Sequence, residues 1–330
     1  MRAYALGRLI MLVPLLFGVS LLTFIMLRAL PADTAVARAG LGATDERVAE
    51  IRAELGLDDP YFPISFKQRF PFVAFHADSQ YGRWITGVFR GDLGESTTFG
   101  TPVTEEIWKR VPITLELVLL SGLITILIGV PAGVVSALRQ NTPLDYLVRY
   151  TSVFGVSIPS FWLGILMLLF PAIWWGWAPP VEYVSIFEDP VQNLQLFILP
   201  AIALAAASAA TVMRLTRSAM LDVLRNDYVR TAWAKGLGER QVMTRHAIKN
   251  ALIPVVTFVG IQFITMISGA VIVEQVFNLD GIGNLLFTAV FSRDFTLTQG
   301  LVLFIAIAVL TCNLCVDLLY GWLDPRIRYT

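Results

Sequence analysis

The chain has 330 residues, of which 56% are hydrophobic and 15% are charged, and its mean hydropathy is +0.67. Basic and acidic residues balance at 25 each, so the formal net charge is zero, and we expect no nucleic-acid partner. This composition excludes a soluble globular domain and indicates an integral membrane protein.

Six apolar stretches are long enough to cross a bilayer, which takes about 20 mostly apolar residues in a helix. They do not show the alternation of apolar and polar residues that is typical of membrane barrels. We therefore predict an all-α fold with six transmembrane helices. The predicted spans are Leu9–Leu27, Ile113–Leu138, Leu147–Trp177, Leu194–Met213, Ala251–Val273 and Leu297–Leu323.

The first span could also be a secretory signal, because Arg2 and Arg8 precede an apolar run. Its apolar core is longer than the roughly 7 to 15 residues of a signal peptide. An uncleaved anchor over residues 1–30 is therefore the preferred interpretation.

Basic residues decide the predicted orientation, because Lys and Arg concentrate in short cytoplasmic loops. Placing both termini in the cytoplasm puts the basic loop between the fourth and fifth spans there as well. The domain plan is then an extracytoplasmic segment with short helices over 31–110, a five-helix membrane core over 111–323 with a basic cytoplasmic loop at 214–250, and a tail over 324–330.

The long outer segment carries its own helix signals. Thr44 followed by two acids predicts a helix that ends at Gly56, and Thr101-Pro102 predicts a second short helix leading to the second span. Between them, a Phe-rich loop over 60–78 suits an outer-surface contact and a membrane-interface position equally well.

Ionisable residues are sparse within the predicted spans. Glu116 lies near the outer end of the second span, and Asp317 is expected near the cytoplasmic interface. A proton-coupled secondary transporter would place carboxylates near the midplane. The sequence offers none there.

Three prolines within the spans are candidate gate or pathway residues, because proline removes a backbone donor and kinks a helix. Glycine and proline are also common in membrane helices, so an ordinary packing role stays open. The three are Pro131, Pro159 and Pro200. Cys312 and Cys315 have C-x-x-C spacing, but inside an apolar run we interpret them as small buried thiols.

Enzymatic interpretations are weak. The two histidines, His76 and His246, are predicted on opposite sides of the membrane, and no G-x-x-x-x-G-K-[ST] phosphate loop occurs. We expect a non-catalytic chain that binds no cofactor or metal.

The segment from Asp227 to Pro254 is polar and reads as two short helices broken at residues 235–238. Gly236 suits the left-handed position that follows a helix end, and Leu237 can fold back onto the last turn of that helix. Gly238 can cap the next helix. The residues alone leave two interpretations of this segment: a basic loop that contacts anionic lipid, or a docking site for a partner protein.

The same segment, YVRTAWAKGLGERQVMTRHAIKNALIPVV, resembles the coupling loop, or EAA loop, of ABC-importer permeases in its dipeptide and oligopeptide form. The resemblance extends over nearly the whole chain. Further matching motifs are RLIMLVPLLFGVSLLTFIMLRALPAD, GDLGES, RVPITLEL, SIPSFWLG, RLTRSAMLDVLRNDYVRTA, VEQVFNLDGIGNLL and VDLLYGWLDPRIRY.

The resemblance implies a type I permease fold in the bacterial or archaeal inner membrane. It also implies an importer built from a second homologous permease, two cytoplasmic ATPases that bind ATP and Mg, and an extracytoplasmic binding protein, surrounded by membrane lipid. The ATPase-coupling residues that it implies are Arg230, Thr231, Ala232, Lys235, Gly236, Leu237, Arg245 and His246.

Substrates other than peptides stay open, since relatives of this family handle nickel, glutathione or other small solutes. An ion-coupled secondary transporter and a non-transport membrane scaffold are the alternatives from other classes.

Overall fold

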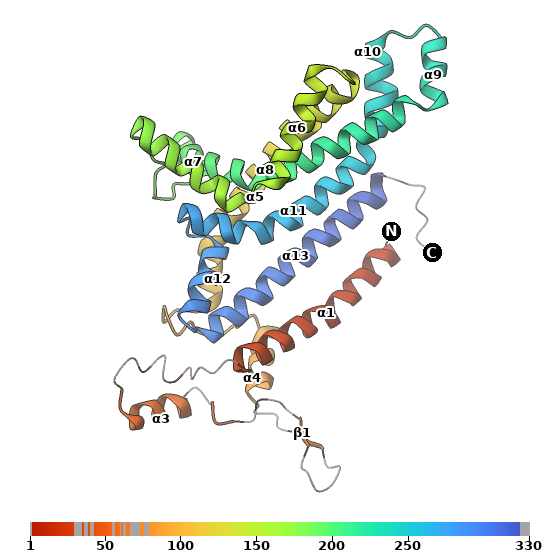
Figure 1. Cartoon of the computed structure of the whole chain (residues 1–330). Coiled ribbons are helices and arrows are strands. Elements are labelled where there is room, and N and C mark those ends of the chain that lie inside the picture. Colours follow the sequence, from red (N-terminus) through yellow and green to blue (C-terminus); the bar gives the residue numbers. More distant parts are fainter. Residues whose placement is uncertain are drawn as a thin grey trace. The chain divides into compact units, whose positions relative to one another are not determined.

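The computed structural model describes residues 2–29, 35, 39, 43–54, 57–59, 61, 64–66, 73–75 and 79–323. Among them the regular secondary structure is helical apart from one short ribbon, and loops join the helices (Figure 1). The helices are α1 (Arg2–Ala29), α3 (Asp45–Glu54), α4 (Gln80–Phe89), α5 (Val103–Leu138), α6 (Pro143–Ser157), α7 (Ser160–Trp175), α8 (Pro190–Leu224), α9 (Asp227–Ala234), α10 (Glu239–Val242), the π-helix η1 (Met243–Ile248), α11 (Lys249–Phe277), α12 (Ile282–Phe291) and α13 (Phe295–Leu323).

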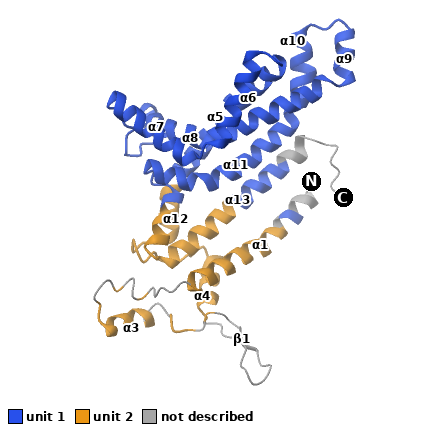
Figure 2. Cartoon of the chain, viewed as in Figure 1, with its two compact units in different colours: residues 1–8, 112–284, 309–330 blue, residues 9–111, 285–308 orange. Residues whose placement is uncertain are grey.

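The chain divides into two compact units (Figure 2). Unit 1 comprises residues 1–8, 112–284 and 309–330, and unit 2 comprises residues 9–111 and 285–308.

Five helical segments among the described residues are long and apolar enough to cross a membrane. The predicted span over 147–177 is not one straight helix, because α6 and α7 meet at 102°. The break falls at Pro159, and the preceding Ile158 has extended backbone with φ −88° and ψ 122°. A residue before proline is driven out of the helical region, so the helix is interrupted at Pro159. Six spans result when this bent pair counts as one.

Three long helices form the core of unit 1. Leu117 of α5, Phe197 of α8 and Met266 of α11 are fully or almost fully buried in one hydrophobic cluster. Lipid tails are as apolar as these side chains, so close van der Waals packing within the cluster, and not removal from water, holds the three membrane helices together.

Asp317 has a structural explanation. Its Oδ2 lies 3.2 Å from the guanidinium of Arg8 within unit 1. A carboxylate in an apolar helix needs a counter-charge. The pair joins the start of α1 to the last turns of α13, in agreement with the prediction that both helix ends lie near the same membrane surface.

The outer segment differs from the prediction in its helix boundaries. α3 begins after Thr44 as expected, whereas Gly56, expected to end it, lies outside the described residues. The short helix predicted after Thr101 is not separate, because α5 continues through Pro112 and gives up only one backbone hydrogen bond there. α4 was not predicted. Its N-cap is Ser79, whose Oγ accepts a hydrogen bond from Gly82 N at 3.1 Å.

The Phe-rich segment contains a short antiparallel ribbon that was not predicted. Strand β1 (Ile64–Phe66) pairs with β2 (Val73–Phe75), with Ile64 opposite Phe75. Most other residues of 60–78 lie outside the described residues. The choice between a surface contact and a membrane-interface position therefore stays open.

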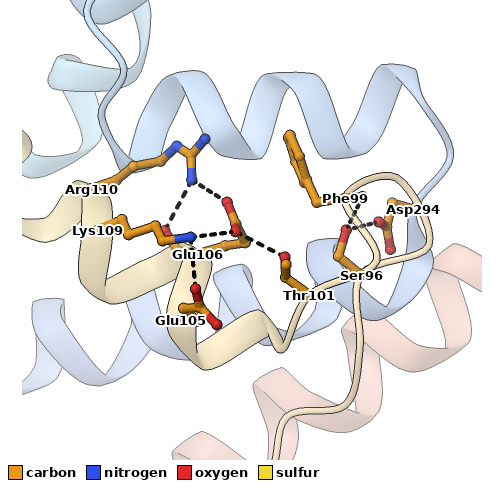
Figure 3. Close-up of polar contacts among 8 residues, drawn as sticks. All are labelled: Ser96, Phe99, Thr101, Glu105, Glu106, Lys109, Arg110 and Asp294. Carbon is orange, nitrogen blue, oxygen red and sulfur yellow. Dashed lines mark hydrogen bonds and ion pairs between the residues drawn. The ribbon is translucent and has the colours of Figure 1, made fainter.

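Unit 2 carries a polar cluster around the GDLGES motif (Figure 3). Asp294 is buried, and its Oδ2 accepts hydrogen bonds from Ser96 Oγ at 2.6 Å and Thr98 N at 2.9 Å. Its Oδ1 accepts from Leu297 N at 3.0 Å, which caps α13. One carboxylate thus fixes both the motif and the start of the last helix.

The interpretation of the two cysteines was wrong. Cys312 is half-buried and Cys315 is exposed on α13. In a membrane, apolar residues also face lipid, so an apolar run does not imply burial within the protein.

Candidate functional site

The turn after α9 has the geometry that the sequence predicts. Gly236 has φ +78°. Leu237 N donates to Ala232 O at 3.4 Å, and Gly236 N donates to Trp233 O at 2.9 Å. These two bonds form a Schellman motif with glycine at its left-handed position. The chain therefore turns sharply at a defined corner.

The second short helix of the loop is not a separate element. Gly238 caps α10, which passes through η1 into α11, so one helical rod runs from Glu239 to Phe277. Polar side chains between 239 and 250 do not end a helix, because a membrane boundary is not a helix boundary. The fifth span is therefore continuous with the corner, and α9 lies beside α10 (Figure 1).

The inner side of α9 packs against this rod and against the ends of two other helices. Val229 and Ala232 are buried, and Ala232 is only 5% exposed. The other buried members of the cluster are Ala137, Met220, Val242, Met243, Ala247 and Ala251. We call these eight residues the loop core. The loop core packs α9 against the other helices of unit 1, and this packing holds α9 in place.

Hydrogen bonds reinforce the π-helical turn. Asn250 Nδ2 donates to His246 O at 2.8 Å and to Tyr228 Oη at 3.1 Å. π-Helical turns inside helices are frequent at functional sites. Here the widened turn gives Tyr228 of α9 a polar attachment to the rod.

The predicted coupling residues differ in how far their side chains are exposed to solvent. Ala232 faces the loop core, so its small side chain allows close packing within this chain. Leu237 and His246 are half-buried. The exposed members are Arg230, Thr231, Lys235, Gly236 and Arg245. Two exposed aromatic residues, Tyr228 at 42% and Trp233 at 43%, were not singled out as docking residues, although both lie on the amphipathic α9.

The exposed side of α9 offers cationic and aromatic groups. Arg230 lies 3.7 Å from Asp227, but both side chains are strongly exposed, and such pairs contribute little to stability. Arginine and aromatic side chains are enriched at protein interfaces. This surface can bind a partner that presents carboxylates and an apolar pocket.

The three prolines occupy different settings. Pro159 is exposed at the break between α6 and α7, whereas α5 continues through exposed Pro131 and α8 continues through buried Pro200. A gate or pathway role for them stays a prediction.

A cleft of about 520 Å³ lies in unit 1 near the predicted outer ends of α5, α8 and α11. Tyr183 in its wall donates a hydrogen bond to Glu116 Oε2 at 3.4 Å. Burial, with a smaller contribution from the Glu116 carboxylate, raises the pKa of Tyr183. The phenol therefore stays neutral at physiological pH and keeps this donor.

Two family models match the chain. Residues 129–329 match the binding-protein-dependent transport system inner membrane component, and residues 1–118 match the N-terminal part of such membrane components. The chain belongs to this family. It is accordingly a multi-pass permease component of the inner membrane.

Curated members of the family align over the full length. The dipeptide transport system permease protein DppB of Alkalihalophilus pseudofirmus is 38% identical, and the alignment covers 100% of both chains. The oligopeptide transport system permease protein AppB of Bacillus subtilis is 36% identical, again over 100% of both chains.

Solved structures confirm the fold of this permease component. One, from inward-facing conformations of the MetNI methionine ABC transporter, has a TM-score of 0.54 at 18% identity, covering 67% of this chain and 96% of that chain. Another, from an amino acid ABC transporter, has a TM-score of 0.53 at 17% identity, covering 66% and 94%. The predicted all-α type I permease fold is thus confirmed.

Proposed function

We propose that the chain is a permease subunit of an ATP-driven importer of dipeptides or oligopeptides. The names of the curated relatives support the peptide class. In this proposal the chain lines a translocation path together with a second, homologous permease. An extracytoplasmic binding protein delivers the substrate, and membrane lipid surrounds both permeases.

The observation that carries the coupling part of the proposal is the exposed corner on α9, fixed by its loop core to the rod from Glu239 to Phe277. A partner that binds α9 differently in two states shifts the permease between two states. Since α9 and the fifth span are packed together, movement of the partner is passed directly to a membrane helix.

In this proposal the partner subunits bind and hydrolyse ATP. Two cytoplasmic ATPases bind ATP and Mg, and each contacts the coupling loop of one permease. The residues that we assign to this contact include Arg230, Thr231, Lys235, Gly236 and Arg245. The permease itself is non-catalytic and binds no cofactor.

The test compares two aspartates at the same corner. Gly236→Asp introduces a side chain at φ +78° and an acid at the end of α9, where the helix dipole disfavours it. Gly238→Asp introduces the same charge at a helix N-cap with φ −63°, where Asp is preferred. The full chain with its genomic partners is purified, and import of labelled tri-alanine into proteoliposomes is measured.

We expect Gly236→Asp to insert normally but to lose ATPase co-purification and import, whereas Gly238→Asp retains both. Equal ATPase recovery with Gly236→Asp and the wild type would contradict docking at this corner. Absence of ATP-dependent import by the wild-type complex would contradict the transport proposal.

A further inference from the structure

A buried ion pair lies beside the loop core. Asp145 of α6 is fully buried, and its two oxygens accept hydrogen bonds from Arg217 of α8, with Nε–Oδ1 at 2.8 Å and Nη2–Oδ2 at 3.0 Å. Two parallel bonds of this kind fix the relative orientation of the two helices.

Neutral donors complete the site. Ser136 Oγ of α5 donates to Asp145 Oδ1 at 2.6 Å, and Asn141 N donates to Oδ2 at 3.0 Å. Asn141 has φ +61°, so the turn between α5 and α6 is shaped to present its N–H to the carboxylate. One side chain therefore joins α5, α6 and α8.

The same stretches of α5 and α8 carry the loop core. Ser136 directly precedes Ala137, and Arg217 lies about one turn before Met220. Slightly further from the loop, a Cβ added at Gly133 would lie 2.6 Å from Thr216 Cβ, so the two helices approach closely there. The ion pair thus lies between a tight helix contact and the packing that holds α9.

We infer that the Asp145–Arg217 pair is a positioning element that makes α5, α6, α8 and α9 move together when a partner moves the coupling loop. The inference rests on the proposed function. Loss of the pair leaves α9 attached through the loop core and α6 packed along α8, but it removes the polar link that ties the α5–α6 turn and the start of α6 to Arg217 of α8. Such a permease still docks its ATPases, and their hydrolysis no longer drives transport efficiently.

The experiment measures labelled tri-alanine imported per ATP hydrolysed by the complete reconstituted complex. The single variant Arg217→Gln leaves the buried Asp145 carboxylate without its ion pair, and Asp145→Asn leaves the half-buried Arg217 guanidinium without its own. The double variant removes both charges and therefore leaves no buried charge uncompensated. The matched control is Arg149→Gln, which removes an exposed guanidinium from α6.

We expect the double variant to co-purify with the ATPases and hydrolyse ATP, while the import-to-hydrolysis ratio falls about tenfold, which corresponds to roughly 1.4 kcal/mol. The single variants show the same fall where they assemble. Arg149→Gln keeps the wild-type ratio.

Two results would overturn this inference and leave the proposed function intact. One is a wild-type import-to-hydrolysis ratio in the double variant. The other is loss of the complex in the single and double variants alike, which would show that the pair serves folding. Failure of the wild-type complex to import tri-alanine overturns the proposed function and, with it, this inference.

Discussion

Glu274 shows how one residue can hold several backbone groups. Its side chain is fully buried at the end of α11 and accepts hydrogen bonds from Thr114 Oγ1 at 2.6 Å, Gly283 N at 2.8 Å and Asn284 N at 3.0 Å. The first N–H groups of a helix have no partner within the helix, and an acid is favoured there. Glu274 therefore caps α12.

We predict that Glu274→Leu lowers the free energy of unfolding by about 3 kcal/mol, because three donors lose their acceptor. Glu274→Gln keeps one acceptor oxygen and loses less. Thermal unfolding in detergent measures both, with exposed Glu182→Gln as the control. The same melting temperature for Glu274→Leu and the wild type would contradict this capping role.

Sequence reasoning succeeded where the cause is local. Gly236 could be predicted because the turn depends on a few neighbouring residues and on the absence of a Cβ. The burial of Glu274 could not be predicted, because it depends on Thr114, 160 positions away in the sequence. The ion pair of Asp145 was missed for the same reason, since Arg217 is 72 positions away.

At the scale of an element, α9 is asymmetric. Its buried side belongs to the loop core, and its opposite side exposes charged and aromatic groups. Ala232 and Ala234 lie two positions apart on this helix, the first buried and the second exposed. The same substitution, made separately at each position, therefore distinguishes an effect on packing from an effect on the surface.

We predict that Ala232→Leu overfills the loop core, costs about 1 to 3 kcal/mol locally and loosens α9, whereas Ala234→Leu does not. Limited proteolysis of the coupling loop in the purified complex measures the difference. Equal cleavage rates for the two variants would show that α9 is not held by this packing.

Helix existence was easier to predict than helix ends. The apolar runs identify the spans, and Pro159 marks the break between α6 and α7. Helix starts near Thr101 and Gly238 were predicted, but not that these helices continue into the second and fifth spans, because a change from polar to apolar residues does not mark a helix boundary. α4 and the β1–β2 ribbon were missed. α4 has an amphipathic pattern that was overlooked, whereas each strand of the ribbon has only 3 residues, too few to show a periodicity.

At the scale of the molecule, the ordered motifs predicted the family, and the family models and full-length relatives confirmed it. The described residues show how this permease component is built. Its helices form the membrane core, and its coupling loop is a firmly packed projection.

Photo-crosslinking from the coupling loop tests the central claim most directly. A photoreactive phenylalanine analogue replaces Trp233, 43% exposed on α9, or Trp177, 37% exposed on the predicted outer side. In the assembled transporter we predict a crosslink from position 233 to an ATPase subunit and none from position 177. No ATPase crosslink from position 233, or equal yields from both positions, would contradict the account.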